Sequence, residues 1–339
     1  MILIDTTYIH SFGGKTIIEI FLKRANDLKL NYHVMIDSRL DSFFLEKNQA
    51  VNYSIVKASH KIRKQFYIRN IKKFSSIFCL ANVPPPFYNK LNTTIFFHNR
   101  LLLNTFSYNI SLKERVINFI KINYIKYYNQ KHYNWAVQTP YMNKLLQENL
   151  IINSDQISIY PVFKEILEIN NSKKLSNNFV YVSSNVSHKN HHRLISAFIA
   201  AANKTDKEFE LHLTLDKKEL PKNVYPKNLK IEFHGTLSEE GVNVIYNLNK
   251  FAIYPSLVES FGLPLIESVN HGCKVIASDL PYVHEIIKPS LTFDPYSIES
   301  ISNAILKAIE KDNLPETKVL VENKLDNFVD FIISQDVQR

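Results

Sequence analysis

The chain has 339 residues, of which 45% are hydrophobic and 22% charged, as is usual for a soluble globular protein long enough for two domains. Its two cysteines, Cys79 and Cys273, lie far apart, which excludes a disulfide framework and a cysteine metal motif. No apolar run approaches the roughly 18 residues of a membrane span, and the start M-I-L-I-D-T-T lacks the features of a signal peptide.

Charge is unevenly distributed. Residues 1–160 carry 21 Lys and Arg against 9 Asp and Glu, whereas residues 161–339 carry 20 against 23. A basic first half and a mildly acidic second half predict two domains with different partners. We expect a protein of the reducing cytoplasm, with a basic half able to lie peripherally on the inner face of the cell membrane.

The first half alternates strand-like and helix-like segments. Residues 15–30 have helical periodicity. Short runs of β-branched and aromatic residues predict strands at 2–7, 32–36, 51–56, 77–83 and 93–98. Strands separated by helices are typical of βαβ units and a parallel sheet.

The pattern restarts after a polar stretch at 168–178, which indicates a linker or a domain edge. Strands are predicted at 179–183, 209–215, 229–234, 251–255 and 274–278. Helices are predicted at 189–201, 238–248 (with Ser238 as N-cap), 264–271, 297–311 and 317–334. The predicted fold is α/β, with two Rossmann-like doubly wound parallel-sheet domains facing a central cleft, in which ligands lie beyond the carboxyl ends of the strands.

The stretch V-E-S-F-G-L-P-L-I-E-S at 258–268 predicts an anion site. Pro264 suits the first position of a helix, where its missing N–H is not needed, and Gly272 suits the position just past the helix, with positive φ. The helix start offers free N–H groups and a positive dipole end beside Gly262, which favours phosphate.

Two carboxylates flank that turn, Glu259 on the loop and Glu267 about one helical turn in. A carboxylate repels phosphate, so we expect both to accept hydrogen bonds from neutral hydroxyl groups beside it. Spacing alone leaves open that both belong to a solvated helix face.

Residues 254–278 resemble the E-x7-E region of retaining GT-B glycosyltransferases, in particular glycosyltransferase group 1, family 4. The resemblance extends to V-Y-V-S-S-N-V-S-H-K-N-H-H-R-L-I-S-A-F at 180–198, to F-H-G-T-L-S, and to L-P-Y-V-H-E-I-I with L-T-F-D-P. It is weaker in the first half, at S-F-G-G-K-T, F-F-H-N-R and A-V-Q-T-P-Y-M.

The resemblance implies an acceptor domain at 1–165, a nucleotide-sugar domain at 166–315, and a helix at 316–339 that crosses back to the first domain. It implies three catalytic residues: Glu259 at the hydroxyls of the transferred sugar, Lys189 at the departing diphosphate, and His98 near the sugar. The implied donor-binding residues are Glu267 at the ribose, the backbone of Phe261, Gly262 and Leu263, a tight loop at Gly13 and Gly14, and Ser184 and Glu285.

Several of these residues have plainer alternatives. His98 could be a core histidine, Gly13 and Gly14 only a turn, and Glu285 only part of a first helical turn. Many relatives carry an Arg where Ser183 and Ser184 stand, which leaves the charge partner of the diphosphate incomplete.

The spacing and types of residues do not match the motifs of other nucleotide-binding or metal-binding sites. A P-loop would need glycine at position 9, which is Ile9. His188, His191 and His192 lack the cysteine or carboxylate of a zinc site, and there is no Asp-x-Asp pattern. No cofactor and no metal are therefore expected, since the nucleotide-sugar is a substrate.

Basic and aromatic residues are interleaved at 57–73, which carries seven Lys and Arg, and at 113–135, which includes Trp135. This pattern suits an anionic membrane surface or nucleic acid, but no nucleic-acid fold signature accompanies it. A plainer alternative is a solvated basic face with its aromatic residues in the core. Given the resemblance, we expect the inner membrane, with no nucleic acid.

The expected reaction moves a sugar from a UDP- or GDP-linked donor to a glycan or to an undecaprenyl-linked or other lipid-linked acceptor, with retention of configuration. The expected setting is bacterial O-antigen, capsule or lipopolysaccharide synthesis. Two alternatives stay open: a GT-B enzyme that epimerises or hydrolyses a nucleotide-sugar, and a non-catalytic nucleotide-sugar-binding scaffold.

Overall fold

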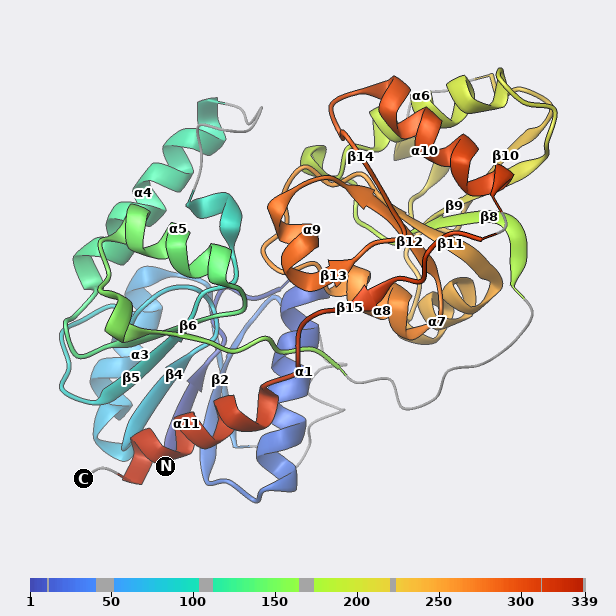
Figure 1. The fold of residues 1–339 in the computed structure, drawn as a ribbon. Coiled ribbons are helices and arrows are strands. Elements are labelled where there is room, and N and C mark those ends of the chain that lie inside the picture. Colours follow the sequence, from blue (N-terminus) through green and yellow to red (C-terminus); the bar gives the residue numbers. More distant parts are fainter. Residues whose placement is uncertain are drawn as a thin grey trace. The chain divides into compact units, whose positions relative to one another are not determined.

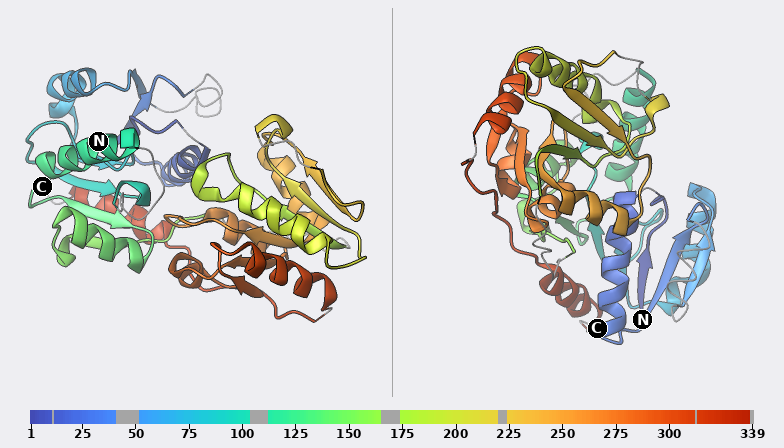
Figure 2. Two further views of the ribbon diagram at one scale, coloured as in Figure 1. Left: turned by 90° about the horizontal axis from the view of Figure 1, so that it is seen from above. Right: turned by 90° about the vertical axis from the view of Figure 1, so that its right-hand side faces the viewer.

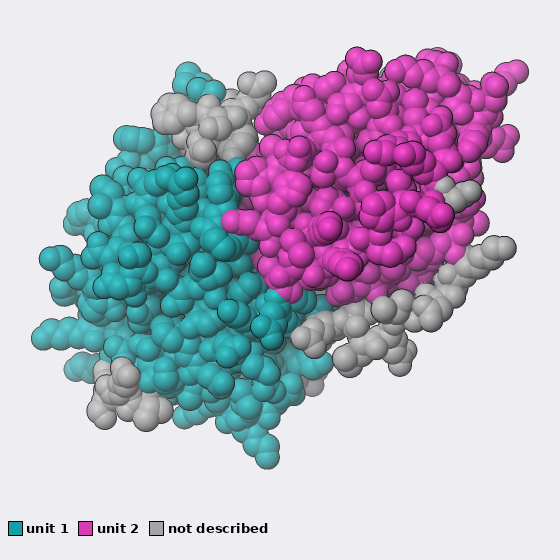
Figure 3. Space-filling view, viewed as in Figure 1, with its two compact units in different colours: residues 1–164, 322–339 teal, residues 165–321 magenta. Residues whose placement is uncertain are grey.

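The computed structural model describes residues 1–10, 12–40, 52–103, 112–164, 174–219, 224–311 and 313–337. Figure 3 colours the two compact units into which the chain divides, residues 1–164 with 322–339 and residues 165–321. Each unit is built on a parallel sheet, so the predicted α/β class is confirmed. Most of the polar stretch predicted at 168–178 lies outside the described residues.

The first unit contains, within the described residues, a parallel sheet in the order β3-β2-β1-β4-β5-β6-β7 (Figure 1). Its strands are β1 (Ile2–Asp5), β2 (Tyr32–Asp37), β3 (Tyr53–Val56), β4 (Ser76–Cys79), β5 (Asn92–Phe96), β6 (Asn134–Val137) and β7 (Ile157–Ile159). Its α-helices are α1 (Phe12–Asp27), α3 (His60–Asn70), α4 (Leu112–Tyr128), α5 (Pro140–Leu150) and α11 (Leu325–Val337), and its 3-10 turns are Ile71–Lys73, Arg100–Leu102 and Ser154–Gln156.

Alternate strand residues build two separate cores, one on each face of this sheet. Ile2 and Ile4 pack with α1 and α11, whereas Leu3 between them packs with α3, α4 and α5. Figures 1 and 2 show α1 and α11 side by side. Burial of both sheet faces is what a parallel sheet requires, and it explains why the strands are nearly continuous runs of apolar residues.

The C-terminal helix belongs to the first unit through an aromatic cluster. The Phe328 ring lies 5.1 Å from Phe21, 5.4 Å from Phe78 and 4.6 Å from Tyr160, measured between ring centroids. The helix is shorter than predicted for 317–334, because the chain is extended at β15 (Lys318–Val319), which pairs with β13 (Ile287–Lys288) before α11 begins.

The second unit has, within the described residues, a parallel sheet in the order β10-β9-β8-β11-β12-β14. Its strands are β8 (Leu175–Tyr181), β9 (Phe209–Leu213), β10 (Leu229–Phe233), β11 (Asn249–Tyr254), β12 (Lys274–Ser278) and β14 (Leu291–Phe293). Its helices are α6 (His191–Ala202), α7 (Glu239–Leu248), α8 (Leu263–Asn270), α9 (Pro281–Ile286) and α10 (Ile298–Glu310), with 3-10 turns at Ser187–Lys189 and Lys217–Glu219.

Two local predictions in this unit are confirmed. The Ser238 side chain accepts a hydrogen bond from the Gly241 N–H at 3.2 Å and caps α7. Gly272 follows α8 with φ of +71°, the left-handed conformation that glycine adopts without steric cost.

Strand order reverses once in each sheet. In the first unit the chain runs outward from β1 to β2 and β3, then returns to pair β4 with the other side of β1. In the second unit it runs from β8 to β9 and β10, then returns to pair β11 with β8. The loops that leave the carboxyl ends of strands at such reversals diverge, and ligands of doubly wound sheets bind there.

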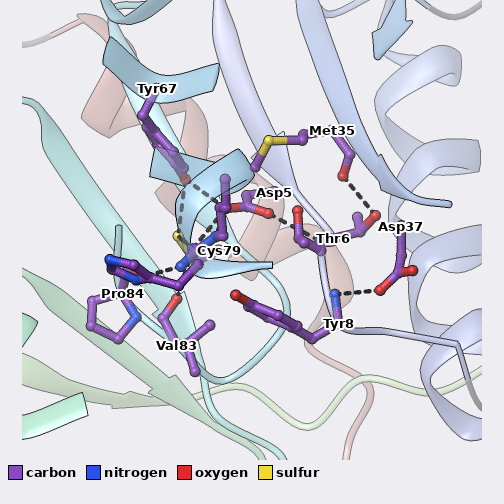
Figure 4. Close-up of polar contacts among 12 residues, drawn as sticks. Asp5, Thr6, Tyr8, Met35, Asp37, Tyr67, Cys79, Val83 and Pro84 are labelled. Atoms are coloured by element: carbon purple, nitrogen blue, oxygen red, sulfur yellow. Dashed lines mark hydrogen bonds and ion pairs between the residues drawn. The ribbon is translucent and has the colours of Figure 1, made fainter. Parts of the chain in front are cut away.

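A buried ion pair lies beside the reversal in the first unit, and Figure 4 shows the polar contacts around its carboxylate residue, Asp5, and around Tyr67. Asp5 and Arg63 are both fully buried, and the Arg63 Nη2 lies 2.7 Å from the Asp5 Oδ2. The Tyr67 hydroxyl donates to the same oxygen at 2.7 Å, and the Thr7 N–H donates to Oδ1 at 3.0 Å. Asp5 thus joins β1 to α3.

The loop predicted at Gly13 and Gly14 is wrong, because both residues lie in the first turn of α1 with no positive φ. Their roles differ. A Cβ on Gly14 would lie 2.4 Å from Cγ2 of the buried Ile9, whereas a Cβ on Gly13 would meet nothing within 4 Å. Gly14 is therefore needed so that the loop after β1 can pack against the helix.

Gly14→Ala should lower the free energy of unfolding by about 1–3 kcal/mol, because overpacking forces Ile9 or the helix to shift. Gly13→Ala is the matched control. It should leave stability unchanged or raise it by up to about 1 kcal/mol through better helix propensity. Chemical denaturation of both variants checks this, and equal effects would contradict the packing argument.

Candidate active site

The loop after β8 is held rigidly against the end of β11. Its 3-10 turn ends at Lys189, and Asn190 follows with φ of +62°. The Asn190 side-chain amide donates to the carbonyls of Pro255 at 3.1 Å and Pro295 at 2.8 Å. The Leu257 N–H donates to the His188 carbonyl at 2.8 Å. These bonds fix where the Lys189 side chain begins.

The loop after β11 ends in a left-handed glycine at the start of α8. Gly262 has φ of +88° and is the N-cap, with Pro264 in the first turn. A Cβ there would lie 3.1 Å from Leu265 Cδ1 and would strain the backbone. Among the described residues, the N–H groups of Gly262 and Leu263 donate to no acceptor. Together with the helix dipole, these donors suit an oxyanion.

An ion pair joins the two loops. The Lys189 Nζ lies 2.5 Å from the Glu259 Oε1, and the side chains are 14% and 17% exposed. The two residues are 70 positions apart, and the β8–β11 pairing brings them together. The structure therefore places these two predicted residues in one site, where each neutralises the other.

These residues line a pocket within the second unit, with an empty volume of about 220 Å³. Its lining is formed by Val182, Lys189, Tyr254, Ser256, Glu259, Gly262, Pro264, Leu265 and Tyr282.

Buried hydroxyl groups form the floor beneath the ion pair. The Tyr181 hydroxyl donates to the Lys189 carbonyl at 3.0 Å and lies 2.8 Å from the Ser256 Oγ. The Tyr282 hydroxyl donates to the Ser256 carbonyl at 2.9 Å. Burial, and secondarily the Glu259 charge, raises the pKa of Tyr181, so its hydroxyl stays neutral. Sequence reasoning missed these residues and Asn190, because their partners lie far away along the chain.

His188 and His191 do not add positive charge at neutral pH. Burial lowers the pKa of His188, and burial together with nearby Lys189 lowers the pKa of His191 to about 4. His191 Nε2 lies 2.8 Å from Ser183 Oγ. Arg193 donates to Asn190 and to the Pro295 carbonyl. Lys189 and the N–H groups before α8 thus remain the groups here that suit an anion.

The other predicted residues of this unit are placed around the pocket rather than in its lining. Glu267 lies in α8, where its charge helps raise the pKa of Tyr246 and Tyr254, although burial is the main cause. Phe261 is buried, so only its backbone can meet a ligand. Ser184 is exposed in the loop after β8, and Glu285 is partly buried in α9.

His98 lies in the first unit, two residues beyond the end of β5. It is partly buried, and burial lowers its pKa to about 4, so its imidazole is neutral at physiological pH. Its polar contacts are made with Asn82 on the loop after β4, and its ring lies 5.4 Å from that of Phe96, measured between centroids.

Within the described part of the chain, no group of three or more His, Cys, Asp or Glu is arranged to hold a metal ion. In the same residues, no helix is long and apolar enough to cross a membrane.

Removing one member of the Lys189–Glu259 pair should lower the free energy of unfolding by more than the energy of the contact between the two residues. Lys189→Met and Glu259→Gln should each lower the free energy of unfolding by about 1–3 kcal/mol, because the partner charge is left poorly solvated. The double variant should lose less than the sum, with a coupling of at least about 1 kcal/mol.

The exposed Lys144–Glu148 pair, 3.9 Å apart, is the control for this double-mutant cycle. Its coupling should be at most about 0.5 kcal/mol, because solvent screens it. Equal coupling in the two pairs would mean that the Lys189–Glu259 contact is only a surface ion pair.

The comparisons with known proteins point to one family. Residues 162–324 match the family model described as glycosyl transferases group 1. The O-antigen chain mannosyltransferase B of Escherichia coli is 30% identical over 87 residues, which cover 25% of this chain and 23% of that protein. The O-antigen chain mannosyltransferase RfbU of Salmonella typhimurium is 27% identical over 170 residues, covering 47% and 46%. The matched segments thus span less than half of each of these relatives.

Solved structures match the whole fold. A glycosyltransferase from Rickettsia africae has a TM-score of 0.66 at 14% identity, covering 100% of this chain and 99% of that one. Anabaena Alr3699/HepE, solved with UDP and glucose, has a TM-score of 0.66 at 12% identity, covering 99% and 97%. The chain thus has the GT-B glycosyltransferase fold, and residues 162–324, which include the candidate site, carry the sequence pattern of glycosyl transferases group 1.

Proposed function

We propose that this protein is a family 4 retaining glycosyltransferase of the hexosyl type, which moves a sugar from a nucleotide-sugar to a glycan or lipid-linked acceptor. The observation that carries the proposal is the pairing of Lys189 with Glu259 beside the N–H groups of Gly262 and Leu263, which donate to no acceptor in the described part of the chain. A cation, oxyanion donors and a carboxylate at one strand-order reversal suit a ligand with a diphosphate and a sugar.

Each group has a role in this reaction. Lys189 and the N–H groups stabilise the charge that develops on the leaving diphosphate. Glu259 accepts hydrogen bonds from hydroxyls of the transferred sugar, and Glu267 from those of the ribose. The bond between the anomeric carbon and the phosphate oxygen breaks, while a bond forms to the acceptor oxygen on the same face. The acceptor proton passes to the departing phosphate. Lys189 and the N–H groups supply the charge stabilisation that a metal ion would otherwise give to that phosphate.

Binding must rearrange the ion pair. In the free protein Glu259 satisfies Lys189 at 2.5 Å, so a diphosphate has to share or replace that partner. The exchange keeps the ammonium paired while it frees the carboxylate for hydroxyl groups. This is why one lysine and one glutamate suit a ligand that combines an anion with a neutral polyol.

The relatives support a proposal for the donor and the setting. Two solved structures of one neighbour contain UDP with glucose or UDP-glucose, and two of the curated relatives are O-antigen chain mannosyltransferases, while others are probable sucrose-phosphate synthases. We therefore propose a UDP- or GDP-linked hexose as donor and a role in O-antigen, capsule or lipopolysaccharide synthesis in the cytoplasm.

A panel of nucleotide-sugars tests this proposal. One donor should raise the melting temperature in EDTA and give product in a transfer assay with lipid-linked or glycan acceptors. Lys189→Ala should reduce kcat/KM by about 100-fold or more, the size of effect of losing one transition-state oxyanion contact, and Glu267→Ala should weaken donor binding.

Lys250→Ala is the matched control, because Lys250 lies on β11 against Phe251, outside the pocket lining. It should leave the rate unchanged. Release of free sugar without an acceptor would favour a hydrolase, and donor binding without turnover would favour a scaffold. Either outcome would overturn the proposal that the protein is a transferase.

We further propose that α4 carries the membrane contact expected of the basic half. Its outward side presents an apolar stripe at helical spacing, formed by Leu112, Val116, Phe119, Ile120 and Tyr127, with Leu112 79%, Phe119 68% and Tyr127 80% exposed. Lys113, Arg115, Lys121 and Lys126 lie on the same helix. Apolar side chains with basic neighbours suit the interface of an anionic bilayer.

Of the other aromatic and basic residues of that half, some are buried and some are exposed. Trp135 is buried in β6, and Arg63 is buried in its ion pair with Asp5, so neither can face a membrane. The lysines at 57, 61, 72 and 73 are exposed. The expected surface thus narrows to α4, α3 and the segments that flank α3.

Vesicle sedimentation tests the α4 surface. Phe119→Ser combined with Ile120→Ser should reduce binding to phosphatidylglycerol vesicles by at least about tenfold, because each buried side chain contributes about 1.5–3 kcal/mol. Val244→Ser, an exposed valine of α7, should change nothing. The proposal that α4 contacts the membrane would be refuted if the wild type bound anionic and neutral vesicles equally. It would also be refuted if the α4 variant bound as well as the wild type.

A further inference from the structure

Two loops of the first unit meet in a specific contact between Asn82 and His98. Asn82 follows β4 and His98 follows β5, which pairs with β4 in parallel. The His98 N–H donates to the Asn82 Oδ1 at 2.7 Å, and the Asn82 Nδ2 lies 3.4 Å from the His98 Nε2. One amide thus holds both the backbone and the ring of His98.

Asn82 adopts an uncommon backbone conformation to make this contact. Its φ is +66°, in the left-handed region that few residues other than glycine enter, although asparagine does so more readily than most. Because uncommon backbone conformations cluster at functional sites, the conformation of Asn82 beside a strand-order reversal suggests that this residue has a function.

The amide orientation determines the histidine tautomer. A backbone N–H can only donate, so the Asn82 atom that meets it must be the carbonyl oxygen, and the NH₂ group must face the ring. The NH₂ donates, so Nε2 must accept and carry no proton. The proton of the neutral ring therefore sits on Nδ1.

We infer that Asn82 is a positioning residue that fixes His98 as a neutral imidazole with its proton on Nδ1, so that His98 donates a hydrogen bond to a ligand oxygen instead of acting as a base. The inference deepens the proposed function and rests on it only for the identity of that ligand, a hydroxyl oxygen of the saccharide.

The state of Nδ1 supports this assignment. Nδ1 is shielded from water and has no hydrogen-bond partner among the described residues. An unsatisfied buried donor costs about 1–3 kcal/mol, so an oxygen that reaches it gains a bond that water does not already provide. Burial is the cause that lowers the pKa of His98 to about 4, and it keeps the ring from becoming a charged donor at neutral pH.

Histidine ¹⁵N NMR tests the tautomer without any assay of activity. The His98 signals, assigned by their loss in His98→Gln, should show Nδ1 protonated and Nε2 unprotonated at pH 7. In Asn82→Asp, the second carboxylate oxygen faces Nε2 and should draw a proton there. The ¹⁵N pattern should reverse, and the pKa of His98 should rise by about one unit or more.

Asn203→Asp, at the exposed end of α6, is the control and should leave the His98 signals unchanged. A wild-type ring protonated on Nε2, or one that titrates near 6.5, would overturn the inference. So would an unchanged ¹⁵N pattern in Asn82→Asp.

Activity adds a separate readout. If the transferase is correct, Asn82→Asp should lower kcat/KM by at least about tenfold while the protein stays folded, the size of one hydrogen bond to a bound ligand. The expected tautomer with no transfer in the wild type would refute the proposed function and leave the role of Asn82 standing.

Discussion

The parallel pairing of β8 with β11 is the constraint on which the candidate site depends. Because the chain leaves β8 in one direction and returns to β11 from the other, the loops that follow these strands start side by side and diverge. Lys189 is carried by one loop and Glu259 by the other. The Asn190 amide and the buried hydroxyl of Tyr181 then bind the loops to the end of the sheet.

Charge balance explains the composition of this site. A lone buried lysine would be costly, and Glu259 satisfies it until an anionic ligand arrives. The left-handed turn at Gly262 adds uncharged donors that need no counter-ion. The site is thus close to neutral when free and offers both a cation and a carboxylate to a ligand that contains phosphate and hydroxyl groups. In the first unit, Asn82 prepares His98 in the same way, by satisfying one ring nitrogen and leaving the other as a donor.

Some predictions were wrong for physical reasons that a sequence does not contain. Gly13 and Gly14 suggest a loop, but Gly14 is required by the approach of Ile9 and both residues are helical. Seven basic residues at 57–73 suggest one charged surface, yet Arg63 points inward because it pairs there with Asp5, whose carboxylate also accepts from Tyr67. Asp5 lies 58 residues before Arg63, beyond the reach of any local pattern.

The sequence by itself determined the elements and their chemistry. Apolar runs, helical spacing, Ser238 as a cap and Gly272 as a helix end are local signals, because they depend on backbone sterics and on burial of one face. It also led to the prediction that Glu259, Glu267 and the turn at Gly262 belong to one motif. Only the tertiary structure decided that Lys189 meets Glu259, that Asn82 sets the state of His98, and that α4 turns its apolar side outward. These facts depend on strand order and on packing between distant segments, which no local pattern encodes.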